Sequence, residues 1–257
     1  LIIVDEASMI DASLMKKLLS RIKVGTRLLF LGDPNQLPSV EPGAVFQELV
    51  QKNILPGSTL TECLRCDLAP IINFASAIKE GNDKSVFECM LQTDEGIISF
   101  HPWPADDLIF VKKYKEYFKE VDSGRLEDMA KFRLLCPLKE GACGASQINE
   151  LLFQASVNKD GGYCPVIISK NDYELNLMNG QMGLMSMHKH RALFLVDGQV
   201  KCFPLSLLPQ YDFGFCLSVH KSQGSEFDHV VLLLPPGSEK FGRKMLYTAV
   251  TRARKKI

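Results

Sequence analysis

Two adjacent carboxylates, Asp5 and Glu6, follow directly after the apolar run LIIV at the start of the chain. A buried strand that ends in Asp-Glu is the Walker B arrangement. Its first acid can hold Mg²⁺, and its second can orient or deprotonate an attacking water. A parallel strand delivers both groups to the carboxyl edge of its sheet, where α/β proteins bind ligands. The pair alone is weak evidence, because an apolar strand followed by Asp-Glu is often only a polar strand end.

A second polar stretch, GDPNQL (32–37), follows the next apolar run, RLLFL (27–31). Gly32 gives the backbone freedom for a tight turn. The side-chain amide of Gln36 both donates and accepts hydrogen bonds, so it is suited to contact a γ-phosphate or an attacking water. The competing interpretation is a solvated loop made of turn-forming residues.

Two further polar stretches lie near the other end of the chain. The stretch SVHKSQGSEF (218–227) follows a strand-like run and supplies hydroxyl, cationic and backbone donors suited to phosphates of DNA or of a nucleotide. The stretch TAVTRAR (248–254) belongs to a predicted helix, KMLYTAVTRARKK (244–256), that carries Arg252 and Arg254. An arginine that reaches a γ-phosphate stabilises charge in the transition state. The alternative is a solvated basic end of a helix.

The elements that must position these residues indicate an α/β protein. Short apolar runs typical of buried parallel strands occur at 1–4, 27–31, 132–138, 213–219 and 228–235. Amphipathic patterns predict helices at 11–22, 44–51, 71–81, 106–121 and 146–156. Asp11 is suited to cap the first of these, and Pro70 and Gly81 bound the third.

The segment from 163 to about 208 has a different pattern. Short strands (PVIIS, QMGLMSM, RALFLV and QVKCFPL) alternate with turn residues, and Asp197-Gly198 is a strong hairpin signal. This predicts a small antiparallel β module set into the α/β protein.

Bulk composition sets wide limits. The 257 residues suffice for one large domain or two ordinary ones, and 30 basic residues balance 30 acidic ones. A neutral chain can still carry a local basic groove, so nucleic acid is not excluded as a partner. No run of 18 apolar residues occurs, which argues against a membrane span. Most cysteines lie inside apolar runs, which favours free thiols and a cytoplasmic location, and the lone Cys63/Cys66 pair is a weak zinc signal.

Taken together, these motifs resemble those of a known family. Five stretches are similar to motifs II to VI of superfamily 1 helicases: VDEASMID, LGDPNQLPSVEPG, LTECLR, SVHKSQGSEFDHVVLLLP and LYTAVTRAR. Their sequences most resemble the RecD branch, which comprises the alpha subunit of exodeoxyribonuclease V and its stand-alone relatives. The resemblance spans nearly the whole chain. It implies two RecA-like P-loop NTPase domains with ATP in the cleft between them. It also implies an SH3-like insertion where the antiparallel module is predicted. The expected division is 1–60 for the first RecA-like domain, 61–162 and 211–257 for the second, and 163–210 for the insertion.

The resemblance also implies residue roles. Asp5 would hold Mg²⁺ with Ser8 as a supporting group, Glu6 would be the catalytic base, and Gln36 would contact the γ-phosphate. Arginines that reach the γ-phosphate from the second domain would be Arg65 and Arg252. Residues at the nucleotide cleft would be Gly224 and Glu226, and residues facing single-stranded DNA would be Ser218, His220 and Lys221. The family often has an aromatic residue or a glutamine after the first arginine, whereas this chain has Cys66, so the packing around Arg65 is open.

The implied activity is that of an ATP-dependent DNA helicase that moves 5′ to 3′ on single-stranded DNA. Its implied setting is recombinational DNA repair, with other subunits of a RecBCD-type nuclease-helicase as partners. The chain begins with Leu and contains no GxxxxGK[ST] stretch, so we expect it to be a fragment that is inactive in ATP hydrolysis alone. Two alternatives stay open at this point. One is a non-catalytic scaffold derived from a helicase, and the other is a helicase acting on RNA, because phosphate contacts do not distinguish the two sugars.

Overall fold

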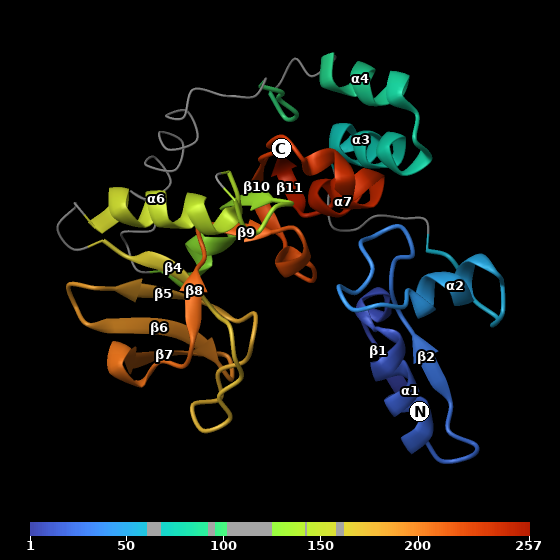
Figure 1. Ribbon diagram of the computed structural model, residues 1–257, viewed down its shortest axis with the longest axis horizontal. Coiled ribbons are helices and arrows are strands. Elements are labelled where there is room, and N and C mark those ends of the chain that lie inside the picture. Colours follow the sequence, from blue (N-terminus) through green and yellow to red (C-terminus); the bar gives the residue numbers. More distant parts are fainter. Residues whose placement is uncertain (61–67, 92–95, 102–124, 142, 158–161) are drawn as a thin grey trace.

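A computed structural model describes residues 1–60, 68–91, 96–101, 125–141, 143–157 and 162–257. Figure 1 shows how the described elements are arranged. The helix expected at 106–121 lies outside these ranges, as do Arg65 and the Cys63/Cys66 pair. The described strands form a two-stranded, a four-stranded and a five-stranded sheet.

The first unit is a β-α-β arrangement, as expected from the sequence. Strand β1 (Ile2–Val4) pairs in parallel with β2 (Leu28–Phe30), and helix α1 (Ala12–Arg21) connects them. The carboxylate of Asp11 accepts a hydrogen bond of 2.7 Å from the backbone N–H of Leu14 and so caps α1. Helix α2 (Val45–Gln51) follows the loop after β2. Ile3 and Leu29, which are paired in register, are 56% and 45% exposed, so one apolar face of this sheet is uncovered by the described residues.

The second unit is a parallel sheet with helices on both faces. It contains β3 (Phe132–Cys136), β9 (Cys216–Ser218), β10 (Phe227–Leu232) and β11 (Ala253–Lys256), in the order β11-β10-β3-β9. Alternation along β3 directs Leu134 toward α6 (Ala145–Val157) and Leu135 toward α3 (Ala69–Glu80) and α7 (Gly242–Val250). Because both faces are covered, every residue of β3 is buried.

Helix α4 (Asp83–Leu91) lies beside α3 and has no counterpart among the predicted elements. Gly81, in the left-handed conformation at φ 72°, ends α3 as expected. The 3₁₀ turns are η1 (Ala7–Met9), η2 (Leu126–Ala130), η3 (Leu205–Leu207), η4 (His220–Ser222) and η5 (Ser238–Phe241).

The helix predicted at 244–256 is too long. Helix α7 ends at Val250, and the chain turns into strand β11, which pairs in parallel with β10. Arg252 and Arg254 therefore do not lie on a helix. Pairing with β10 outweighs the local helical preference of this segment, as tertiary context commonly does.

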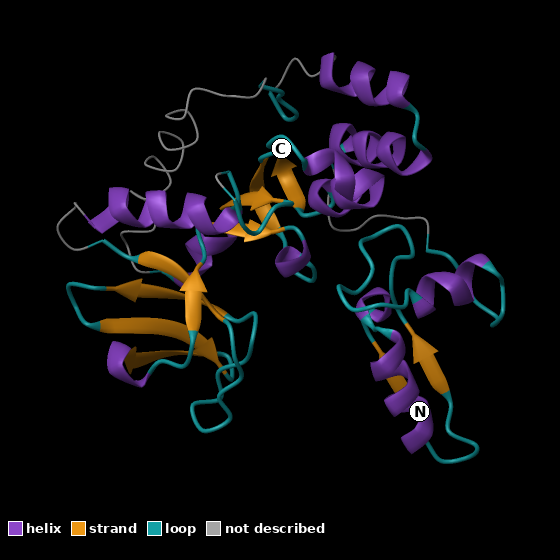
Figure 2. Ribbon diagram, in the orientation of Figure 1, coloured by secondary structure: helices purple, strands orange, loops and turns teal. Residues whose placement is uncertain are grey.

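The antiparallel module contains β4 (Cys164–Ile168), β5 (Met182–Ser186), β6 (Arg191–Val196), β7 (Gln199–Pro204) and β8 (Tyr211–Phe213). Their order is β7-β6-β5-β4-β8, and Figure 2 shows them as a separate layer of strands below α6. The turn between β6 and β7 is Asp197-Gly198, with φ of 54° and 75°, as its sequence predicts. The sheet continues to residue 213, past the boundary expected at 210, because β8 pairs with β4. The division into domains otherwise stays a prediction.

None of the helices in the described ranges is long and apolar enough to cross a membrane.

Candidate functional site

The two adjacent acids lie where β1 ends, at the carboxyl edge of the two-stranded sheet. Oδ1 of Asp5 accepts a hydrogen bond of 2.9 Å from the N–H of Glu6. Glu6 has φ 49° and ψ 41°, a left-handed conformation that costs a residue with a side chain about 1 kcal/mol or more. The next residue, Ala7, donates to the carbonyl of Leu31 after β2 at 2.8 Å, which holds this bend in place. The strained turn presents the acids at the edge of the sheet.

Gly32 brings the second polar stretch against the first. A Cβ added at Gly32 would lie 3.1 Å from the backbone N of Ser8 and 3.2 Å from that of Ala7. The absence of a side chain therefore permits the close approach of the two loops. The segments 5–8 and 32–36 share one edge of the sheet, in agreement with their expected positions.

Two buried polar atoms at this edge have no hydrogen-bond partner among the residues that the structure describes. They are Oγ of Ser8 and Oε1 of Gln36. An unpaired buried polar group costs about 1–3 kcal/mol. Both residues belong to the loops that follow β1 and β2, where a polar ligand would satisfy both groups.

Metal-binding capacity is modest in the described part of the chain, where no three His, Cys, Asp or Glu side chains converge. Mg²⁺ does not require such a cluster, because it is commonly held by one or two carboxylates together with substrate phosphates and waters. The exposed carboxylate of Asp5 and the unpaired hydroxyl of Ser8 are oxygen donors of the right kind.

The predicted residues of the second unit form a separate group. Arg252 is fully buried; its Nη1 donates to the carbonyl of Ser225 at 3.2 Å, and its Nε donates to the carbonyl of Thr248 at 3.1 Å. Gly224, at φ 74°, is exposed, and Glu226 is half-buried in the same loop. Arg252 thus ties the loop before β10 to the end of α7, and its contact with a γ-phosphate stays a prediction.

A cavity of about 310 Å³ lies between α6, β8 and β9. Ser218 and Lys221, two of the predicted DNA-binding residues, line it. Polar and aromatic residues without a predicted role also line it, and these include Lys139, Ser146, Asn149, Tyr211, Asp212 and Phe213. Hydroxyl groups, ammonium groups and aromatic rings are the groups that single-stranded nucleic acid contacts through its phosphates and bases.

One of the two lysines that line this cavity, Lys221, is already paired with a carboxylate. Nζ of Lys221 lies 2.9 Å from Oδ2 of Asp212, which also accepts a hydrogen bond of 2.8 Å from Ser169. Burial raises the pKa of Asp212, whereas the hydrogen bonds from Lys221 and Ser169 and the charge of Lys221 lower it. The lowering effects together are larger, so the pKa of Asp212 lies below its ordinary value. Asp212 is therefore charged at neutral pH and competes with any phosphate for Lys221.

Asn149 of α6 fixes the strand that carries Ser218. Strand β9 is the edge of the four-stranded sheet. The amide of Asn149 donates to the carbonyl of Cys216 at 2.9 Å and accepts from its N–H at 2.8 Å. These bonds satisfy backbone groups that an edge strand would leave unpaired.

His220, the third predicted DNA-binding residue, is not among the lining residues of the cavity. It is half-buried at the start of η4, and burial lowers the pKa of its imidazole. His220 is neutral at pH 7 and offers a hydrogen-bonding group but no charge.

Sequence reasoning missed the residues that join the two units. The hydroxyl of Tyr247 donates to Oδ2 of Asp33 at 2.8 Å, and the hydroxyl of Thr248 accepts from the N–H of Leu37 at 2.8 Å. Tyr247 and Thr248 lie inside LYTAVTRAR, a stretch in which the sequence indicates a role only for the arginines. Lys139, which lines the cavity, has no predicted role either.

Two family profiles and several known proteins match this chain in sequence. The family profile described as an AAA domain matches residues 1–101, and that of a UvrD-like helicase C-terminal domain matches residues 213–257. The RecBCD enzyme subunit RecD of Mycolicibacterium smegmatis is 30% identical over 272 residues, covering 100% of this chain and 49% of that protein. The ATP-dependent RecD2 DNA helicase of Deinococcus radiodurans is 29% identical, covering 99% of this chain and 35% of that protein.

Over its whole length the chain is similar in sequence to the RecD branch of helicase superfamily 1. It spans about half the length of the RecD relatives that it matches. The solved structure of Bacteroides Pif1 bound to ssDNA has the same fold, with a TM-score of 0.57 at 15% identity over 98% of this chain and 68% of that one. Pif1 in complex with ADP-AlF3 and ssDNA gives a TM-score of 0.58 at 14% identity, covering 99% of this chain and 68% of that one. The RecA-like assignment of the parallel sheets is thereby confirmed, and the antiparallel sheet accompanies them as expected.

Proposed function

We propose that this RecD-like chain is part of an ATP-dependent DNA helicase that moves 5′ to 3′ on single-stranded DNA. The observation that carries the proposal is the edge formed by Asp5, Glu6 and Gln36, where a strained turn and two unpaired buried polar atoms accompany the acids. RecD and RecD2 relatives, the latter named as an ATP-dependent DNA helicase, support the same activity.

In this proposal the chain's own groups divide the work. The carboxylate of Asp5 and the hydroxyl of Ser8 hold Mg²⁺, which neutralises phosphate charge when bound. Glu6 orients and deprotonates the attacking water, and Gln36 contacts the γ-phosphate. Arg65, which lies outside the described residues, and Arg252 stabilise charge on the γ-phosphate. Gly224 and Glu226 border the nucleotide.

DNA contacts belong to the cavity and its neighbours. Ser218 and Lys221 bind phosphates along one wall, and His220 donates from the adjacent turn. RecBCD subunits among the relatives support other subunits of such a complex as partners and recombinational repair as the setting. The six described cysteines are free thiols, which supports a reducing, cytoplasmic location.

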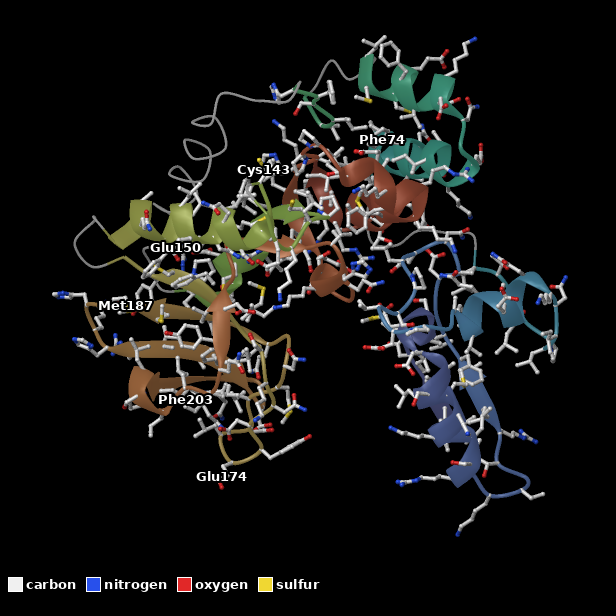
Figure 3. All side chains as sticks on the ribbon, in the orientation of Figure 1. Phe74, Cys143, Glu150, Glu174, Met187 and Phe203 are labelled. Carbon is white, nitrogen blue, oxygen red and sulfur yellow. The ribbon has the colours of Figure 1, made fainter. Side chains whose placement is uncertain are left out.

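The test is DNA-stimulated ATP hydrolysis by the native polypeptide, that is, the protein as its source cell makes it. Glu6→Gln keeps the size of the side chain and removes the base, so turnover should fall by about a hundredfold or more. Glu174→Gln makes the same chemical change in the loop of the antiparallel module, far across the molecule from β1 in Figure 3, and should leave turnover unchanged.

Full activity in Glu6→Gln would refute the assigned role of the base. Absence of ATP hydrolysis from the native polypeptide would refute the function. The 257-residue chain alone, without a GxxxxGK[ST] stretch, should not hydrolyse ATP at a measurable rate.

A further inference from the structure

Leu37, the residue after Gln36, is inserted into the core of the second unit. Its side chain is 5% exposed and belongs to a cluster whose other buried members all come from residues 71–253. The cluster includes Ala249 of α7 and Val219, just after β9. Leu37 therefore follows the first unit in sequence, but its side chain packs in the hydrophobic core of the second unit.

The backbone of Leu37 is also held by the second unit. Its N–H donates to Oγ1 of Thr248 at 2.8 Å, and its carbonyl accepts from Nε2 of Gln223 at 2.9 Å. Thr248 is 0% exposed, and its hydroxyl in turn donates to the carbonyl of Lys244 at 2.7 Å. The N–H and the carbonyl of Leu37 are thus both bonded to side chains that lie far along the chain.

Two more contacts hold the flanks of this segment. The hydroxyl of Tyr247 donates to Asp33, and Lys244 donates to Gln47, whose amide donates to the carbonyl of Gln36 at 3.1 Å. Gln36 consequently cannot shift relative to α7 without breaking buried hydrogen bonds. In Figure 1 this junction lies where the loops above β1 and β2 approach α7.

The same junction is close in sequence to the candidate DNA site. Ser218 and Lys221 line the cavity, and Gln223 follows Lys221 by two residues in the same turn. Contact of the cavity with a strand of nucleic acid that displaces this turn would pull on the carbonyl of Leu37. Gln36 directly precedes Leu37 and belongs to the loop after β2, which approaches the loop that carries the two acids.

We infer that Leu37, held by Thr248 and Gln223, is the positioning residue that couples occupancy of the DNA cavity to the placement of Gln36. This coupling rests on the proposed function. A ligand at one site can change the other only through a contact whose free energy depends on both sites, and the Leu37 peptide is such a contact.

The test compares Thr248→Val with Thr248→Ser in the native polypeptide. Valine has nearly the shape of threonine but cannot accept the hydrogen bond from Leu37, whereas serine keeps the hydroxyl. The ratio of ATP turnover with single-stranded DNA to turnover without it should fall at least about fivefold in Thr248→Val and stay near the parent value in Thr248→Ser. Amide hydrogen exchange at Leu37 should quicken in Thr248→Val alone.

Gln223→Ala, at a half-buried position, is the second variant should Thr248→Val fail to fold, and it should reduce the same ratio. An unchanged ratio in the variants, with an active parent, would overturn the coupling and leave the proposed function intact. Faster exchange at Leu37 with an unchanged ratio would also overturn it, because the bond would then be structural only. A parent without ATP hydrolysis would overturn the proposed function and the coupling with it.

Discussion

Replacing Asn149 by alanine should destabilise the second unit through two buried backbone groups. The side chain of Asn149 pairs with both the N–H and the carbonyl of Cys216, and Cys216 is almost fully buried. Alanine would leave both groups without a partner. Each unpaired group costs about 1–3 kcal/mol, so the free energy of unfolding should fall by about 2–6 kcal/mol for the two together.

Urea unfolding followed by circular dichroism measures this loss. With a slope of about 3 kcal/mol per molar urea, the transition midpoint should fall by about 0.7–2 M while the slope stays the same. Gln154→Ala is the matched control, because Gln154 lies on the same helix, is exposed, and bonds only to the side chain of Glu150. Its effect should stay within about 0.5 kcal/mol.

A midpoint for Asn149→Ala equal to that of the control would refute the argument, since it would mean that water or another group satisfies Cys216. The same variant should also weaken binding of single-stranded DNA, because β9 carries Ser218 into the cavity.

Two further outcomes concern charge near the cavity. Asp212→Asn removes the carboxylate that pairs with Lys221, so affinity for single-stranded DNA should rise about two- to fivefold and should depend more steeply on salt concentration. Fluorescence anisotropy across a salt series measures both quantities. Unchanged affinity would exclude Lys221 as a phosphate contact. Burial lowers the pKa of His220, so the unfolded chain takes up that proton at a higher pH than the folded chain. Stability should therefore fall as the pH drops below about 6.5, and His220→Asn should remove this part of the pH dependence of urea unfolding.

Local chemistry predicted the elements that depend on neighbouring residues. Asp11 caps α1, Gly81 ends α3 and Asp197-Gly198 turns between β6 and β7, because in each case the deciding interaction lies within a few residues. The positions of Asp5 and Glu6 followed in the same way, since a strand of known direction carries them to its own end.

Long-range pairing explains what the sequence could not show. The segment around Arg252 has a helical pattern, but residues 253–256 form strand β11 because they pair with β10. This pairing cannot be read from the local pattern. The partners of Leu37 lie 186 and 211 residues away, so no local pattern indicates that its N–H and carbonyl will meet Gln223 and Thr248. The motif resemblance implied roles for Gln36 and Arg252 but none for Tyr247, Thr248 or Gln223, whose side chains join the two units.

Two of the three buried side-chain atoms without a hydrogen-bond partner in the described residues lie in the loops that follow β1 and β2, and the third is Nε of Arg133. Glu6 is held in a left-handed conformation, and the buried oxygens of Ser8 and Gln36 lack partners, although the surrounding loops are well packed against Gly32. A sequence selected only for stability would remove such costs, since glycine at position 6 or an apolar residue at position 8 would do so. Their occurrence in the loops that follow β1 and β2, close in sequence to Leu37, agrees with the proposed role of this edge in binding a phosphate.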